Sequence, residues 1–160
     1  MNIFYLSPSP KWAARSQCDK HVVKMVLETA QMLCSAQRWY GAEDDHLYAD
    51  THKHHPSAVW ARANNQNYKW LHEHFMYLSE EYTLRYMRRH KSAIALLEPL
   101  RRVPDGIPRG NFFTPPQCMP AEFKHPCTVT AYKAYYRHKA KTVDMRWTYP
   151  GVKPAFMGTP

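Results

Sequence analysis

One segment near the start of the chain aligns ionisable side chains with helical spacing. Five polar residues follow one another at intervals of 3, 4, 3 and 4 residues: His21, Lys24, Glu28, Gln31 and Ser35. This spacing places them on one face of an α-helix. An imidazole, an ammonium and a carboxylate side by side are groups that general acid–base chemistry uses.

The other positions of this segment are mostly apolar, which is typical of a buried helix. Buried charges must satisfy one another or serve a site. Two interpretations remain open: a solvated stripe with a Lys24–Glu28 ion pair, or a functional site. The site hypothesis predicts that Glu28 is substantially buried and within hydrogen-bonding reach of Lys24, His21 or the N-terminal arm.

Histidines gather before a proline in the segment THKHHPSAVWAR, residues 51–62. Pro56 fixes its own φ and keeps His55 out of helical geometry, so His54 and His55 should lie in an extended turn. We predict that this pair borders the same pocket as Glu28. A surface cluster of histidines is the plainer alternative, and a metal site is disfavoured because adjacent histidines point apart and no further ligand is evident.

A third group of candidates lies in TAYKAYYRHKAKT, residues 130–142. Lys133, Arg137 and Lys141 are four residues apart and would share one helix face, with Tyr136 beside them. We predict that these residues bind DNA, the cations by contacting phosphates. The alternative is a solvated basic face whose tyrosines pack in the core.

Composition indicates one basic domain over residues 1–160, with a net charge of +9 and 14% aromatic residues. Such a balance favours a polyanionic partner, most simply double-stranded DNA, with aromatic rings available for stacking on bases. The four cysteines form no CxxC pair, and no histidine–cysteine set has finger spacing, so we expect reduced thiols, no metal and no cofactor. The opening MNIFYLSPSP is too short and too interrupted by proline for a leader or a membrane span, which predicts a cytoplasmic protein.

Periodicity predicts an all-α fold of three main helices plus shorter ones, with no repeat. An extended arm or single strand over residues 2–6 comes first. Helices are expected over residues 11–40, from about residue 56, and over 65–89, 92–101 and 128–143, with Asn64 or Asn65 capping the third. Residues 103–126 hold six of the 13 prolines and should form an ordered irregular excursion, while the tail after Asp144 should wrap the surface.

Several stretches resemble the pyrimidine-dimer DNA glycosylases of the endonuclease V type. Asp19-Lys20-His21, followed by Glu28 and then Arg38, is similar to the family's Asp-x-His helix with its catalytic glutamate. The 51–62 segment, the helix end at Glu80–Tyr86, the segment Tyr132–Ala140 and the opening MNIFYLSP resemble further family segments. DKHVVKM and HKHHPSAVW also resemble signature segments of uncharacterised phage proteins, whose setting would be the host cytoplasm.

The resemblance implies a metal-free enzyme that binds bent DNA and flips out a nucleotide. In that family the N-terminal α-amine attacks the sugar C1′, and the glutamate assists glycosidic cleavage and later strand elimination. Carried over, Glu28 is the acid/base and Lys24 and His21 are catalytic-pocket or phosphate contacts. Asn2, Gln31, His54, His55 and Arg62 are the substrate-binding candidates.

One departure concerns the nucleophile. Methionine before asparagine is normally retained, so the attacking amine would belong to Met1 rather than to residue 2, and its long side chain would need room. Lys24 is the alternative nucleophile, four residues from Glu28 on the same face.

Three functions therefore compete. The first is a DNA glycosylase, with or without AP-lyase action, on a damaged or modified pyrimidine. The second is a transferase of thymine hypermodification that joins an amino acid or amine to an activated 5-hydroxymethyluracil in DNA, with Glu28 as general base. The third is a non-enzymatic DNA-binding protein.

Overall fold

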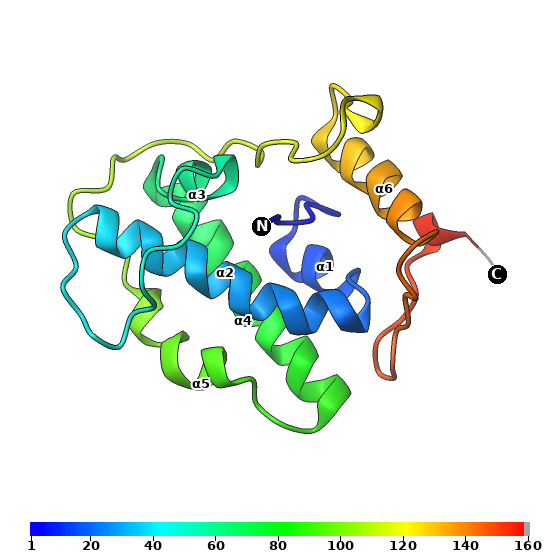
Figure 1. Cartoon of the computed structure of the whole chain (residues 1–160), viewed down its shortest axis with the longest axis horizontal. Coiled ribbons are helices and arrows are strands. Elements are labelled where there is room, and N and C mark those ends of the chain that lie inside the picture. Colours follow the sequence, from blue (N-terminus) through cyan, green and yellow to red (C-terminus); the bar gives the residue numbers. More distant parts are fainter. Residues whose placement is uncertain (159–160) are drawn as a thin grey trace.

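The computed structural model describes residues 1–158, and it is all-helical, as the sequence predicts. Six α-helices and three short 3₁₀ helices occur in this part of the chain, which contains no strand. Figure 1 shows α2 and α4 crossing at the centre, with α3 above them, α5 below them and α6 set apart at the upper right.

The helix expected over residues 11–40 is two helices, α1 (Pro10–Arg15) and α2 (Asp19–Trp39). The chain between them bonds to distant segments instead of continuing the helix. Cys18 donates its N–H to the Tyr136 hydroxyl at 2.9 Å, and the Ser16 carbonyl accepts from Trp147 Nε1 at 3.2 Å. The prediction of a single helix was wrong because these partners lie more than 100 residues away in sequence.

The helices after the histidine turn begin where local signals place them. Helix α3 (Pro56–Ala61) begins at its proline, and α4 (Asn65–Tyr86) is capped by Asn64, whose side chain accepts from two backbone N–H groups. Helix α4 packs against both α1 and α2. It ends at Tyr86, three residues before the predicted end. The next residue, Met87, has a left-handed φ of 52° and caps the helix.

Two further predicted helices are shorter than expected. The 92–101 helix is α5 (Lys91–Leu96) followed by a separate 3₁₀ turn, Pro99–Arg101. Pro99 lacks the N–H that a continuous helix would use. The last helix, α6 (Thr128–Lys139), stops four residues early. Two more 3₁₀ turns, Ala121–Phe123 and Ala155–Met157, precede and follow it.

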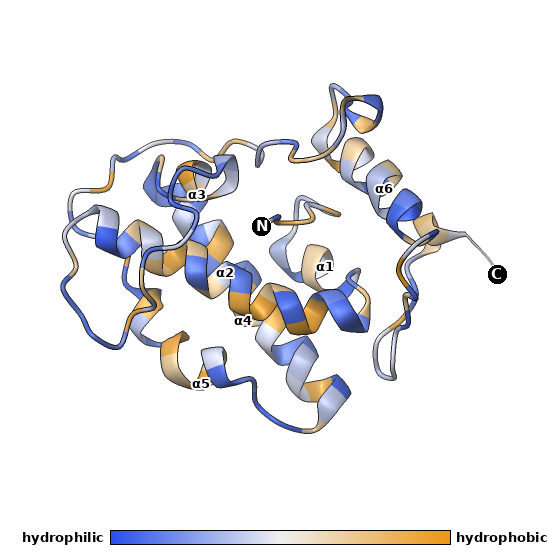
Figure 2. Ribbon diagram, in the orientation of Figure 1, coloured by the Kyte–Doolittle hydropathy of each residue, from blue (hydrophilic) through white to orange (hydrophobic). Residues whose placement is uncertain are grey.

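The N-terminal arm is not a strand; it enters the core and turns at Phe4, whose φ of 52° is left-handed and whose carbonyl accepts from Leu6 N–H at 2.7 Å. Its residues 3–6 are all buried, and the ring of Phe4 stacks on His21 with centroids 4.6 Å apart. Figure 2 shows apolar residues concentrated where α2, α4 and the arm meet. The core therefore holds the start of the chain against the middle of α2.

The proline-rich excursion crosses the molecule as a strap, defined here as residues 108–118. Figure 1 shows it running from beside α3, past the N-terminus, to α6. It contains no helix, yet it is tied to neighbouring elements by backbone hydrogen bonds, such as Asn65 N–H to the Pro108 carbonyl at 2.9 Å. Within residues 1–158, none of the helices has the length and apolarity needed to cross a membrane.

Candidate active site

The Glu28 carboxylate lies between the start of the chain and Lys24. One oxygen accepts from the Asn2 N–H at 3.3 Å and lies 3.9 Å from the Met1 α-amine, while the other is 3.3 Å from Lys24 Nζ. The Glu28 side chain is 14% exposed, whereas that of Lys24 is 67% exposed. The expected geometry of a largely buried carboxylate in reach of the arm is thus present.

Met1 and Asn2 hold the α-amine in this position. The Met1 side chain is only 2% exposed and packs against the core, so it points away from the carboxylate's open side. The Asn2 amide accepts from the N–H groups of Ile3 and Phe4, and it donates to the Cys118 carbonyl at 3.0 Å. The long Met1 side chain therefore has room in the core, and Asn2 holds the turn of the arm through its hydrogen bonds.

His21 supports the arm rather than contacting Glu28. The Tyr136 hydroxyl, which accepts from Cys18 N–H at 2.9 Å, lies 2.7 Å from His21 Nδ1. Burial, together with the nearby charges of Lys139 and Lys24, lowers the pKa of His21 to about 4. This imidazole is therefore neutral at pH 7.

The histidine turn approaches the same centre through His55. Its Nδ1 accepts from Ser57 N–H at 3.1 Å, so a neutral His55 carries its proton on Nε2. Burial and then the Met1 α-amine lower the pKa of His55, while Glu28 raises it. Both charges are thus close enough to act on this ring. His54 and His55 line a cavity of about 560 Å³ whose other lining residues are Asp50, His52 and Lys53. Glu28 does not line this cavity, so the pocket predicted to be shared by Glu28 and the histidine pair stays a prediction.

Arg62 lies beneath the histidine turn. It is buried, its guanidinium covers the Trp39 ring at 4.0 Å, and it donates to the Lys53 carbonyl at 2.6 Å. Arg62 thereby holds the backbone of the histidine turn at Lys53. Gln31 lies one turn beyond Glu28 on α2 and is half-buried.

Helix α6 separates the predicted DNA-binding residues into two kinds. Arg137 and Lys141 are exposed and Lys133 is half-buried, with its ammonium 5.3 Å from the Phe156 ring centroid. Tyr136 is fully buried and bonded to Cys18 and His21. The assignment of Tyr136 to a DNA contact is therefore corrected: Arg137 and Lys141 are exposed, but Tyr136 faces the core.

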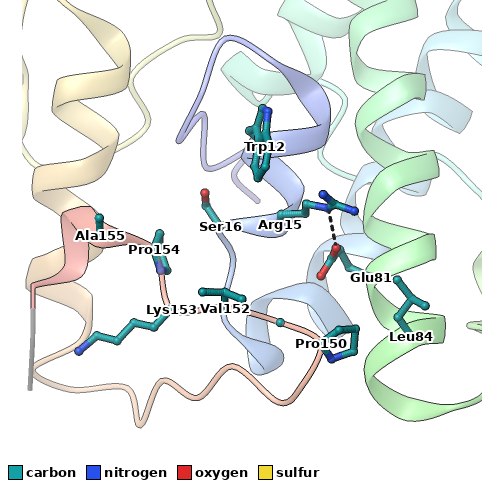
Figure 3. A pocket seen from close by; sticks show the side chains of 11 residues that line it. Trp12, Arg15, Ser16, Glu81, Leu84, Pro150, Val152, Lys153, Pro154 and Ala155 are labelled. Carbon is teal, nitrogen blue, oxygen red and sulfur yellow. Dashed lines mark hydrogen bonds and ion pairs between the residues drawn. The ribbon is translucent and has the colours of Figure 1, made fainter.

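A second ionic cluster lies at the N-terminus of α2. Arg85 is fully buried and bridges Asp19 at 3.1 Å and Glu81 at 2.8 Å. Asp19 also accepts from the backbone N–H and the hydroxyl of Thr148, and Glu81 accepts from Arg15. Figure 3 shows this Arg15–Glu81 pair beside a cavity of about 650 Å³ between α1, α4 and the tail, which Glu28 does not line.

Cys118 joins the candidate site without any signal in the sequence. Its carbonyl holds Asn2, and its thiol sulfur lies 3.5 Å from the buried Ser57 hydroxyl. Only the proline-rich composition of residues 103–126 indicated an ordered segment there, with no indication of where it would pack. Among residues 1–158, no group of three histidine, cysteine, aspartate or glutamate side chains could hold a metal ion.

Comparison with known proteins agrees with this architecture. A family profile described as pyrimidine dimer DNA glycosylase matches residues 1–95, which include the arm, Glu28, the histidine turn and the Asp19–Glu81–Arg85 cluster. The chain therefore belongs to the pyrimidine dimer DNA glycosylase family, a family that acts on DNA. No curated protein and no solved structure shows significant similarity.

Proposed function

We propose that this protein is a DNA glycosylase that acts on a damaged or modified pyrimidine flipped out of double-stranded DNA, followed by an AP-lyase step. The observation that carries the proposal is the α-amine of Met1, 3.9 Å from the Glu28 carboxylate, with the Met1 side chain buried. A nucleophile and an acid/base group in contact, the first fixed by its own side chain, are the two parts that the reaction needs.

In the proposed reaction the neutral α-amine attacks the sugar C1′ and the bond from C1′ to the base breaks. The departing base takes the bonding electrons and gains a proton. The amine nitrogen gives one proton to Glu28, and the C1′–O4′ bond then breaks, so that the sugar ring opens and an iminium ion links C1′ to Met1. O4′ takes the bonding electrons and receives that proton from Glu28, which becomes a carboxylate again. Removal of a C2′ proton by the Glu28 carboxylate then expels the 3′ phosphate, and water releases the enzyme.

Lys24 is the competing nucleophile, and two features favour Met1 over it. The Lys24 side chain is 67% exposed and mobile about four carbon–carbon bonds. The Met1 amine instead belongs to a backbone held by Asn2 and by a buried side chain, so less entropy is lost when the nucleophile is positioned. Lys24 then serves as a cationic partner of Glu28 and a phosphate contact.

The remaining candidates surround the proposed nucleotide. The Nε2–H of His55 is available to donate to a sugar or phosphate oxygen, since Nδ1 is already occupied by Ser57 N–H. His54 lines the adjacent cavity, and Gln31 extends the polar line of α2. Arg62 holds the turn that presents both histidines, and Asn2 holds the amine.

Borohydride trapping tests the proposal, because reduction of the iminium ion makes the protein–DNA link permanent. Duplexes with an abasic site or a pyrimidine dimer should give a trapped complex whose DNA-bearing peptide begins at Met1. Intact mass should show that Met1 is present and unblocked. Lys24→Met should still be trapped, whereas a chain with one glycine placed before Met1 should lose trapping yet keep its binding to DNA.

A trapped peptide containing Lys24 would replace Met1 as the nucleophile, and failure to trap any complex would overturn the glycosylase proposal. The transferase hypothesis makes a different prediction, that nucleosides of 5-hydroxymethyluracil DNA gain the mass of an added amine. Mass spectrometry of digested DNA distinguishes the two activities.

A further inference from the structure

The strap is fixed along its length although it contains no helix. Near its start, the Pro108 carbonyl accepts from Asn65 N–H, and Gly110 N–H donates to the Asn65 side chain at 3.1 Å. The Asn111 carbonyl then accepts from the Asn64 side chain, also at 3.1 Å. Two adjacent asparagines at the start of α4 thus set the path of the strap.

Phe113 is held by its backbone while its ring remains outside. Its N–H donates to the Asn67 side chain at 3.2 Å and its carbonyl accepts from Trp60 Nε1 at 2.8 Å. Both partners are buried, yet the Phe113 side chain is 50% exposed. The preceding Phe112 instead turns inward, with its ring 6.0 Å from that of Trp70.

The strap carries this ring close to the candidate active site. Five residues after Phe113, Cys118 contacts Ser57 on α3 and holds Asn2 through its carbonyl. Trp60, which holds Phe113, lies three residues after Ser57 on the same helix face. One turn of helix rises about 5.4 Å, so the backbone of Phe113 is held about one turn along α3 from Ser57, the residue that the Cys118 thiol contacts.

We propose that Phe113 stacks on the DNA base next to the nucleotide that enters the Glu28 site. A nucleotide that leaves the helix opens a gap between its neighbours, and an aromatic face fills such a gap with favourable contacts. Because the backbone of Phe113 is already immobilised on both sides, little ordering cost remains when the ring binds. The exposed Arg109 on the same strap adds a cation beside the phosphates.

This inference deepens the proposed function and rests on it, since DNA must lie over Glu28 for Phe113 to reach a base. It concerns a part of the chain beyond the 1–95 family match. The partner is defined by chemistry, as the face of a nucleobase rather than a hydrogen-bonding edge. The contact should therefore depend on the aromatic ring and tolerate any base.

Binding of the full chain to a duplex with a tetrahydrofuran abasic analogue tests the proposal without chemistry, since that analogue cannot form an imine. A 2-aminopurine beside the analogue reports stacking through its fluorescence. Phe113→Ala should weaken binding by about 5- to 150-fold, the range of one base–aromatic stack, and should remove most of the fluorescence change. Phe113→Trp should retain both properties, and Phe113→Leu neither.

Tyr149→Ala is the matched control, because Tyr149 is an aromatic side chain with 89% exposure on the C-terminal tail. Equal affinity and equal fluorescence change in Phe113→Ala and the wild type would overturn the stacking role, and would leave an interface with another protein as the use of this ring. Lack of duplex binding by the wild type would instead overturn the proposed function itself, so the two failures are distinguishable.

Discussion

Helix α2 carries two carboxylates that the fold treats in opposite ways. Asp19 at its start is bonded at 2.7 to 3.1 Å to Arg85 and Thr148, and Arg85 continues to Glu81. Glu28, two and a half turns further on, has only contacts of 3.3 to 3.9 Å, two of them to amines. The first carboxylate has its hydrogen-bonding capacity used by the protein, whereas the second retains capacity for a proton or a substrate.

The difference shows why the same sequence signature contains two acids. Asp19 and Arg85 join α2, α4 and the C-terminal tail, and this cluster sets the angle at which α2 leaves α1. Glu28 lies further along α2, and its polar contacts are with Met1, Asn2 and Lys24 rather than with this cluster.

The largest loss of stability should come from breaking the cluster of Asp19, Arg85 and Glu81. Arg85→Met leaves Asp19 without its cation and Glu81 with only the partly exposed Arg15, which should cost about 3–5 kcal/mol in the free energy of unfolding. Lys24→Met removes a mostly exposed ion pair and should cost at most about 1 kcal/mol. Urea denaturation of both variants measures the contrast, and equal losses would mean that Arg85 is not the centre of the cluster.

Glu28→Gln tests the open carboxylate. The substitution preserves volume and removes acid/base capacity, so glycosylase activity should fall by about 100-fold or more, with the unfolding midpoint nearly unchanged. Asp19→Asn is the counterpart and should lower stability more than it lowers the activity of the folded fraction. Single-turnover assays alongside urea denaturation separate the two outcomes, and a Glu28→Gln variant that is unstable but active would reverse the assignment.

Acid should lower the free energy of unfolding through two buried histidines, His21 and His74. Burial lowers the pKa of both His21 and His74 to about 4, below the ordinary value of 6.5. Between these values the unfolded chain binds more protons than the folded one, so stability is full above pH 6.5 and falls as the pH drops toward 4. Each histidine should contribute a slope of up to about 1.4 kcal/mol per pH unit.

Urea denaturation between pH 7 and 4.5 gives this slope. His21→Gln should reduce the slope by up to about 1.4 kcal/mol per pH unit, which corresponds to one proton. This reduction does not depend on the absolute stability of the variant. A slope that His21→Gln leaves unchanged would show that the ring titrates alike in both states. Acid would then loosen the arm through some other group.

Local sequence signals predicted the helix starts well. Pro56 and Asn64 begin α3 and α4 because proline geometry and an asparagine cap act within a few residues. The break between α1 and α2 was missed because Tyr136 and Trp147 cause it from the other end of the chain. Periodicity cannot register a hydrogen-bond partner of that separation.

The candidate site shows the same division. The spacing of Lys24 and Glu28 on one helix face was readable from the sequence, and the geometry places them in contact. The meeting of Glu28 with Met1, Asn2 and the strap depends on how the arm enters the core. Tyr136 shows the limit of a face argument, since a tyrosine beside a basic line can equally face the interior.

The smallest expected effect concerns charges that belong to neither carboxylate. Lys133 and Arg137 lie on α6 and contact Phe156 of the tail, while Lys141 lies just beyond the end of this helix. If each contacts a phosphate, its change to alanine should weaken binding to all duplex sequences alike. The dependence of log K on log salt should fall by about 0.9 per lost contact.

Arg88→Ala, which removes an exposed cation just beyond α4, is the control. Titrations at several salt concentrations measure the slopes, and slopes equal to that of Arg88→Ala would show that the α6 cations only face solvent. A reduced slope with an unchanged single-turnover rate would indicate that bound DNA contacts these cations but that they take no part in the reaction at Glu28. The basic residues would then supply affinity, and Glu28 the chemistry.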